Sequence, residues 1–177
     1  MKARERLIRA INHQETDRPP LDLGATVISG IHASALAKLR EALGLPKRPV
    51  TVHEPFQMLG AVDDEVRREL GVDVVGLFNP GTAFGYRNEG WKPWTLNDGT
   101  EVLMAGAFEY DRNEAGEILA YPQGDRSCAP SLKMPAGGWF FDAIDRAGPM
   151  DEDDLDARRD FSEQFTLFSE EDGAYFE

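Results

Sequence analysis

The chain has 177 residues, of which 41% are hydrophobic and 10% aromatic, and this composition excludes an intrinsically disordered protein. The formal net charge of −13 argues against nucleic acid and anionic membranes as partners, because both repel an acidic surface. No run approaches the ~20 apolar residues of a membrane span, and the charged first residues lack the apolar core of a secretory signal. One cysteine, Cys128, excludes an internal disulfide and suits a reducing compartment, so we expect a cytoplasmic protein.

Residues 1–80 alternate between helix and strand patterns. Apolar side chains on one face predict a short basic helix from Arg4 to Ile11, and residues 15–20 (ETDRPP) end it because proline cannot continue a helix. The next predicted elements are a strand at 21–24, a helix at 29–43, a helix in two pieces at 56–70 with Asp63 as N-cap and Gly71 at its end, and a strand at 72–78. The nearly continuous apolar run at 72–78 suits a parallel strand covered on both faces. This order predicts an α/β fold, either a barrel or a doubly wound sheet.

Residues 81–141 have a different character. Strand patterns at 91–96 and 100–104 flank the tight turn Asn97-Asp98-Gly99, and residues 108–110 and 117–121 flank a second turn at 113–116. A third pair is predicted at 131–134 and 139–141. We therefore expect an antiparallel hairpin insert at 81–141, placed after the α/β segment 1–80.

Residues 142–177 are strongly acidic, with thirteen acidic and three basic residues, whereas residues 1–48 carry nine basic and five acidic residues. The acidic segment is interpreted as a solvated linker rather than a site for a cation or a basic partner. Residues 169–172 (SEED) resemble a capping box, the start of a helix, and Glu177 follows within two turns. From this pattern we expect a truncated helix and a chain that is part of a longer protein.

Taken in order, several motifs resemble the N-terminal part of the uroporphyrinogen decarboxylase-like superfamily. They are the Arg4-Glu5-Arg6 helix, the turn at 17–20 (DRPP), the strand 21–24 (LDLG), residues 71–75 (GVDVV) and Asp98-Gly99. This superfamily includes decarboxylases of haem synthesis and corrinoid-linked methyltransferases, and its members are eight-stranded β/α barrels. Because a barrel typically needs about 250 residues, the resemblance implies a partial barrel of two βα units with an antiparallel insert.

Two departures from the decarboxylases bear on the chemistry. Decarboxylases of this superfamily carry two arginines after the first strand that bind substrate carboxylates, whereas residues 24–32 contain no arginine or lysine. They also place a catalytic aspartate after the second strand, where this chain has Asn79, and an amide does not replace a carboxylate charge. The resemblance therefore implies a parent protein that transfers a methyl group involving a corrinoid. Decarboxylation of a tetrapyrrole by a divergent site and a non-catalytic binding module or inactive fragment are the alternatives.

The methyltransferase branch uses zinc held by one histidine and two cysteines, ligands that zinc prefers. The resemblance implies that these ligands lie late in the barrel, beyond residue 177, and Cys128 has no matching spacing. We expect no metal site and no cofactor in this chain, with corrinoid and zinc belonging to a full-length parent. Expected partners are a small-molecule substrate or a corrinoid protein, and open edges of parallel strands predict self-association of the inactive, isolated chain.

Three polar residues are candidates for contacting a substrate: Asp22, His32 and Asn79. His32 follows the first predicted strand, at the face of a barrel where active sites form, but it also fits a helix-terminal residue without a catalytic role. For Asp22 we favour pairing with a cation such as Arg18, or a structural hydrogen bond, over a place in the barrel mouth. Asn79 follows the second predicted strand and can donate to a substrate, although Asn-Pro-Gly is also an ordinary turn.

Other polar and aromatic residues are given structural interpretations. His53 and Glu54 are adjacent, so in an extended chain they point apart and are not predicted to form an acid–base pair. Asp73 is interpreted as a turn-facing carboxylate. A group of aromatic residues predicts the core of a small sheet rather than a ligand pocket: Trp91, Trp94, Trp139, Phe140 and Phe141.

Overall fold

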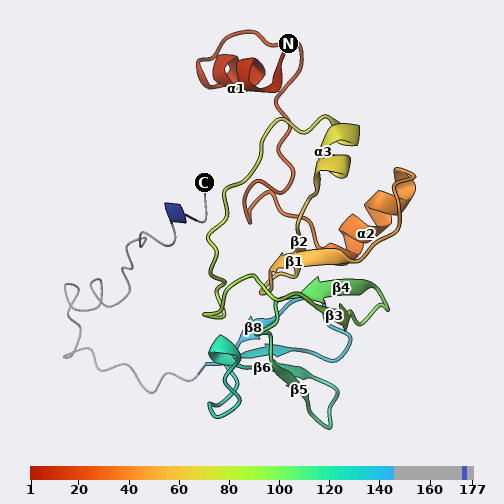
Figure 1. Cartoon of the computed structure of the whole chain (residues 1–177), viewed down its shortest axis with the longest axis vertical. Coiled ribbons are helices and arrows are strands. Elements are labelled where there is room, and N and C mark those ends of the chain that lie inside the picture. The colour runs from red at the N-terminus through yellow and green to blue at the C-terminus, as the bar shows by residue number, and fades with distance from the viewer. Residues whose placement is uncertain (146–172, 175–177) are drawn as a thin grey trace, which may run out of the picture.

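The computed structural model describes residues 1–145 and 173–174, and within them the chain is a mixed α/β protein with two four-stranded sheets (Figure 1). The expected α/β class is therefore confirmed, and the described residues form no closed barrel. Helix α1 lies at one end of the molecule, and the second sheet lies at the other. None of the helices in the described ranges has the length and apolar character needed to cross a membrane.

Within residues 1–145, the helices α1, α2 and α3 overlap segments that capping and periodicity predict to be helical. Helix α1 spans Ala3–Ile11, α2 spans Ala33–Ala42 and α3 spans Asp64–Leu70. Asp63 caps α3 by accepting hydrogen bonds from the amides of Glu65 and Val66 at 3.0 and 3.1 Å, and Gly71 ends it in the left-handed conformation at φ 67°. Helix α2 starts later than the predicted Ser29, because residues 24–29 form a turn closed by the Gly24 amide on the Ser29 carbonyl.

The first sheet has the order β2-β1-β4-β3. Its strands are β1 (Val50–Glu54), β2 (Leu59–Gly60), β3 (Lys92–Thr95) and β4 (Glu101–Met104). Strands β3 and β4 form the predicted hairpin around Asn97-Asp98-Gly99. Strand β1 pairs parallel with β4, with Val50 opposite Val102, and this pairing joins residues 1–80 and 81–141 in one sheet.

The second sheet is antiparallel throughout, with the order β5-β6-β7-β8. Its strands are β5 (Tyr110–Arg112), β6 (Ile118–Ala120), β7 (Leu132–Met134) and β8 (Asp142–Ala143), and a short 3-10 turn, η1 (Pro122–Gly124), follows β6. The predicted hairpin at 108–121 is confirmed by the pairing of β5 with β6. The strand predicted at 139–141 is wrong: residues 139–140 form a bend, and β7 pairs with β8 at 142–143 instead. The pairings between strands within residues 92–143 are antiparallel, whereas β4 also pairs parallel with β1 outside the predicted insert.

One cluster of buried hydrophobic side chains runs through both sheets and helix α2. Phe108 lies at its centre, with its ring 5.5 Å from the Trp94 ring and 6.1 Å from the Phe141 ring. Trp94 and Phe141 therefore belong to the core, as predicted for the aromatic group, whereas Trp91, Trp139 and Phe140 are exposed. The other fully buried large side chains are Leu36, Val52, Met58, Val66, Val102, Met104, Ile118 and Met134.

The strands predicted at 21–24 and 72–78 do not form in the described residues. Residues 23–24 form a bend, residues 21–22 and 72–78 have no regular secondary structure, and neither segment belongs to a sheet. An extended segment counts as a strand only when a neighbour supplies a regular ladder of hydrogen bonds. Between these two segments, the described residues form only isolated hydrogen bonds, at Leu21 and Asp73.

The sequence interpretation of residues 50–63 also needs correction. Residues 56–62 are not helical: a turn at 55–58 leads into β2, which pairs antiparallel with β1. Strand β1 was not predicted at all. Its five residues lie between Pro49 and Pro55, too short a segment to stand out without its partner β4, some 50 residues further along the chain. The capping box predicted at 169–172 lies outside the described residues.

Candidate functional site

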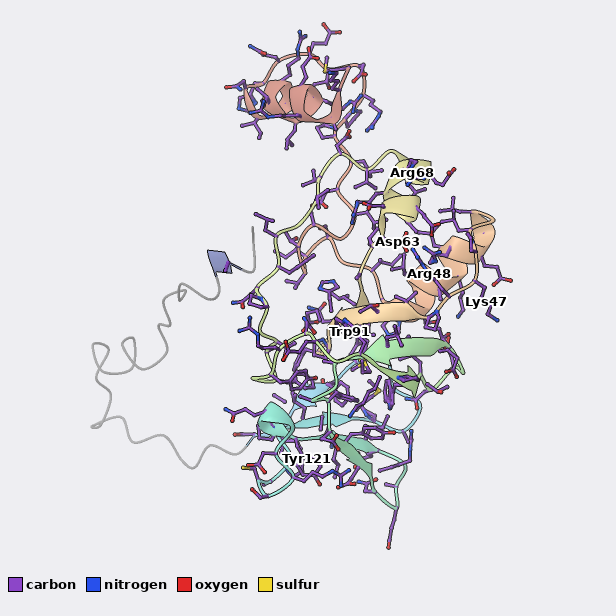
Figure 2. All side chains as sticks on the ribbon, viewed as in Figure 1. Lys47, Arg48, Asp63, Arg68, Trp91 and Tyr121 are labelled. Atoms are coloured by element: carbon purple, nitrogen blue, oxygen red, sulfur yellow. The ribbon has the colours of Figure 1, made fainter. Side chains whose placement is uncertain are left out.

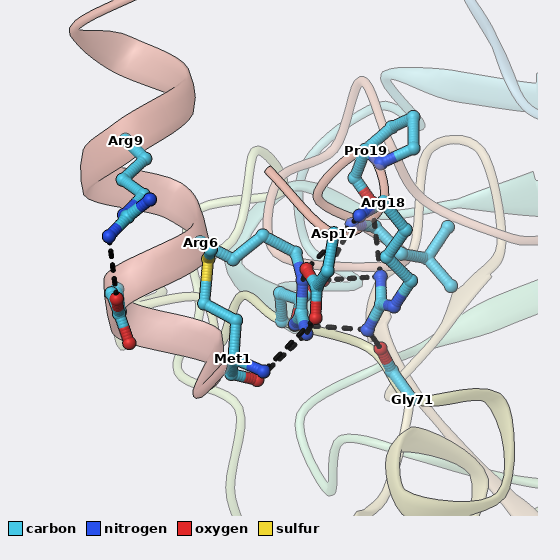
Figure 3. Close-up of polar contacts among 10 residues, drawn as sticks. Met1, Arg6, Arg9, Asp17, Arg18, Pro19 and Gly71 are labelled. Atoms are coloured by element: carbon cyan, nitrogen blue, oxygen red, sulfur yellow. Dashed lines mark hydrogen bonds and ion pairs between the residues drawn. The ribbon is translucent and has the colours of Figure 1, made fainter. Parts of the chain in front are cut away.

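An ion-pair network ties helix α1 to two distant segments (Figure 3). Arg6 clamps Asp17 with two hydrogen bonds, at 2.7 Å from Nε and 2.9 Å from Nη2, and its Nη1 contacts Asp73. Arg18 also reaches Asp73, at 2.7 and 3.2 Å, and donates to the Gly71 carbonyl at 2.7 Å. The network connects α1, the turn at 17–20 and residues 71–75.

Asp73 is the buried centre of this network, with a side chain only 2% exposed. Burial by itself would raise the pKa of this carboxyl group, but hydrogen bonds from the Leu21 amide, Arg18 and Arg6 hold it below its usual value. The pKa of Asp17 is lowered chiefly by its hydrogen bonds from Arg6. Asp73 is thus a structural carboxylate, and the interpretation that excludes a catalytic role is consistent with its contacts.

The two segments predicted as parallel strands lie side by side, joined near Asp73. The Asp73 amide donates to the Leu21 carbonyl at 2.8 Å, and the Leu21 amide donates to the Asp73 carboxylate at 2.9 Å. Further along, a Cβ on Gly76 would lie 2.2 Å from the Ala25 carbonyl oxygen, so the two backbones are in direct contact there. Both segments advance in the same direction, as neighbouring parallel strands do.

Apolar side chains on and beside these segments have no cover in the described part of the chain. Ile28 is 95% exposed, Leu77 81% and Val75 66%. Exposed apolar side chains on adjoining segments are typical of an interaction surface or of a core that another segment completes. We call Val27, Ile28, Val75 and Leu77 the open apolar face.

The predicted site residue His32 is the N-cap of α2. Its Nδ1 accepts from the Ser34 amide at 3.2 Å, and its Nε2 lies 3.1 Å from the Trp139 carbonyl oxygen. The rings of Trp139 and Phe140 meet the imidazole edge-on at 5.4 and 5.6 Å. Burial lowers the pKa of His32, against the smaller opposite effect of the Trp139 contact. These contacts give His32 a structural role in joining α2 to the loop before β8.

The other two predicted site residues make local turns. The Asp22 carboxylate accepts from the Ala25 amide at 3.1 Å, the structural hydrogen bond that we favoured, while Arg18 pairs with Asp73 instead. Asn79 accepts from the Gly81 amide at 2.9 Å, which is the ordinary turn alternative. None of the contacts within the described ranges joins Asp22, His32 and Asn79.

A second polar group, at the carboxyl end of β1, was not predicted as a site. Glu54 turns away from His53 and accepts from the amides of Phe56 and Gln57 at 3.0 and 2.8 Å, as expected for adjacent residues in a strand. His53 contacts Phe78 instead, with 4.3 Å between ring centroids, and its carbonyl accepts from the Asn88 side-chain amide at 2.7 Å.

Three buried polar atoms around this strand end have no hydrogen-bond partner among the described residues. They are His53 Nε2, the Tyr86 hydroxyl and Asn88 Oδ1. Burial lowers the pKa of His53, and burial together with the Glu54 charge raises the pKa of Tyr86, so both side chains are neutral near pH 7. Most buried polar atoms in proteins are paired, so three such atoms near one strand end indicate a polar site. The only sequence signal was the His53-Glu54 pair before Pro55, which could not reveal this grouping.

Charged side chains form a third cluster, between α2 and α3 (Figure 2). Arg40 is 3% exposed and contacts Asp63 and Glu65, and Arg48 reaches the same two carboxylates at 3.1 and 2.9 Å. A cavity of about 720 Å³ opens between α2 and the β3–β4 turn, with both arginines in its lining. Since each arginine already has two carboxylate partners, this cluster is structural.

The described residues contain no group of three or more His, Cys, Asp or Glu side chains that fits a metal ion. Cys128 is exposed and its thiol lies 3.4 Å from an Asp125 carboxylate oxygen. No family model matches the chain, and neither the curated proteins nor the solved structures contain a significant match to it.

Proposed function

We propose that the chain is the N-terminal part of a uroporphyrinogen decarboxylase-like β/α barrel, and that the parent protein transfers a methyl group involving a corrinoid. The observation that carries the proposal is the network around Asp73. It brings together Arg6, the turn at 17–20 and residues 71–75, three of the motifs on which the resemblance rests. Motifs that are separated in sequence but meet in one buried network are consistent with a shared structural role.

The open apolar face supports the barrel part of the proposal. Residues 21–25 and 73–76 lie side by side in one direction, as the first two strands of a barrel would, and Ile28, Val75 and Leu77 beside them are exposed. In a β/α barrel such side chains pack against further strands and helices. We propose that segments outside the described residues cover this face.

Methyl transfer is preferred over decarboxylation because two features of the decarboxylase site are missing. The loop at 24–32 contains no arginine or lysine to bind substrate carboxylates. Asn79 replaces the catalytic aspartate, and its side chain is engaged in a turn with Gly81. Decarboxylation by a divergent site is the second candidate, favoured only by the resemblance.

The described residues do not fit the zinc set of the methyltransferase branch, because His13, His32, His53 and Cys128 are not grouped with one another. We therefore derive no step through zinc or the corrinoid in this chain. In the proposal, this part of the protein supplies two neighbouring strands and the polar side chains at their carboxyl ends.

The first test is the mass of the native protein in its source cells, measured by blotting with an antibody raised against residues 1–177. We expect a band at the size of a complete barrel, about 250 residues or more. The purified native protein is then assayed for transfer of the methyl group from methylcobalamin to an added thiol, followed by the visible spectrum of the cobalamin, and for decarboxylation of uroporphyrinogen.

A full-length band with methyl transfer supports the proposal, and decarboxylation would favour the second candidate. A band at 19.7 kDa without either activity would favour a non-catalytic binding module and contradict the proposal.

A further inference from the structure

We infer that His53, Tyr86 and Asn88 form a binding site for an uncharged ligand group that both donates and accepts hydrogen bonds, such as a carboxamide or a hydroxyl. The inference starts from the three unpartnered polar atoms: His53 Nε2, the Tyr86 hydroxyl and Asn88 Oδ1. Leaving a buried polar atom without a partner costs stability, and a ligand that pairs with it recovers this loss.

The contacts of these side chains hold them near the end of β1. The Asn88 amide nitrogen donates to the His53 carbonyl at 2.7 Å, which anchors the segment at 86–88 to the strand. The Tyr86 ring packs edge-on against Phe84 at 5.8 Å and is 6% exposed. The side chains are therefore fixed by packing, while their unpaired atoms are left for a partner.

The charge of the site selects the ligand class. His53, Tyr86 and the Asn88 amide are neutral, and the nearby Glu54 carboxylate is already held by the amides of Phe56 and Gln57, so this set offers no unengaged charge to balance an anion or a cation. The Tyr86 hydroxyl offers a donor and Asn88 Oδ1 an acceptor, while the imidazole nitrogen takes either role according to its tautomer. A group with one acceptor and one donor complements this set, whereas a charged group would lose its hydration without a counter-charge.

The Phe78 ring lies against the His53 ring, and the neighbouring Leu77 is exposed. In the proposed site, the ligand reaches the imidazole when the Phe78 side chain rotates away from it. The site lies near the carboxyl end of residues 72–78, one of the two strands of the proposed barrel. Ligand binding at the site does not depend on the proposed function.

The test uses three planar probes of the same shape and different charge: acetamide, acetate and acetamidinium. Each is titrated into the purified 177-residue chain while NMR follows the His53 ring and the Asn88 side-chain amide. We expect saturable shifts with acetamide and none with either charged probe over the same concentrations. Tyr86→Phe, which keeps the ring, should weaken acetamide binding by about 3- to 10-fold, the value of one hydrogen bond.

One further variant completes the design. Tyr121→Phe is the matched control, because the Tyr121 hydroxyl already donates to Asp111 at 2.5 Å, and it should leave acetamide affinity unchanged. The inference is overturned if acetamide gives no saturable shift at His53 and Asn88, if acetate binds equally well, or if Tyr86→Phe has no effect.

The probes include no methyl donor and no corrinoid, so this experiment and the test of the proposed function fail independently. A negative titration with a full-length native band would remove the site but leave the barrel proposal. Saturable acetamide binding with a native band at the size of the short chain would support the site but contradict the barrel proposal.

Discussion

The backbone amide of Asp73 donates to the carbonyl of Leu21 at 2.8 Å, while the Asp73 carboxylate accepts from the Leu21 amide at 2.9 Å. One residue thus joins two segments that lie more than 50 positions apart. The same carboxylate holds Arg6 and Arg18, so backbone pairing and charge neutralisation depend on a single side chain. This dependence gives the first prediction.

Asp73→Asn should lower the free energy of unfolding, because two arginines lose their shared negative partner while the shape of the side chain is kept. Asp64→Asn is the control, since the Asp64 side chain is 82% exposed. Urea unfolding of both variants should show a much larger loss for Asp73→Asn. Equal losses would mean that the Asp73 network does not hold these segments together.

Gly76→Ala tests the contact between the two segments. A methyl group at this position would lie 2.2 Å from the Ala25 carbonyl, so we expect a loss of about 1–3 kcal/mol, typical of overpacking. Gly81→Ala meets only the Asn79 side chain at 3.5 Å and should change stability by less than about 1 kcal/mol. Thermal unfolding monitored by circular dichroism measures both, and a neutral Gly76→Ala would contradict the close approach.

The open apolar face should make the purified chain self-associate. Leu77→Lys places a charge on this face and should lower the oligomer fraction, because a charged residue resists burial against a second apolar surface. Ala115→Lys introduces the same charge at the exposed tip of the β5–β6 hairpin and should leave the oligomer fraction unchanged. Light scattering after size exclusion at several concentrations gives the masses. Association that persists unchanged in Leu77→Lys would assign it to another surface.

Acidification from pH 7 to about 5.5 should reduce stability, because burial lowers the pKa of His32 and His53 in the folded chain below the unfolded value of about 6.5. The unfolded chain therefore binds more protons in this window. The contribution of these histidines to the free energy of unfolding is fully present above their pKa in the unfolded chain. It is lost as the pH falls through their pKa in the folded chain.

Urea unfolding at a series of pH values measures how the free energy of unfolding depends on pH, and His53→Gln should reduce this dependence. A pH dependence that stays the same in His53→Gln would show that this imidazole is not the group that titrates.

Tyr86→Phe should raise the free energy of unfolding of the ligand-free chain by about 1 kcal/mol, because it removes a buried hydroxyl without a partner among the described residues. Tyr121→Phe should act in the opposite direction, because it removes a hydroxyl that donates to the Asp111 carboxylate. Opposite signs in chemical denaturation are the expected result. A destabilised Tyr86→Phe would mean that the hydroxyl is already paired in the ligand-free chain.

Elements governed by neighbouring residues could be predicted from the sequence. The turn Asn97-Asp98-Gly99 specifies the β3–β4 hairpin, because glycine at φ 82° adopts the left-handed conformation that this turn needs. Asp63 and Gly71 set the two ends of α3 in the same way, through hydrogen bonds within a few residues. The turn alternatives considered for Asn79 and Asp22 are equally local, and their contacts agree with them.

Features that depend on distant partners could not be predicted in this way. Strand β1 is defined by β4, and residues 72–78 did not become a ladder strand because no neighbour within the described ranges supplies one. His53 could be judged only against Glu54 in sequence, whereas its actual neighbours are Phe78 and Asn88.

The sequence by itself determined the mixed α/β class, the hairpins and the helix caps, because these follow from side-chain periodicity and from hydrogen bonds between near neighbours. The tertiary structure alone decided that Arg6, Asp17, Arg18 and Asp73 share one network, and that the unpaired atoms of His53, Tyr86 and Asn88 lie around the end of β1. The physical reason is that burial and charge pairing depend on which distant segments meet, and a linear pattern of residues does not record those meetings.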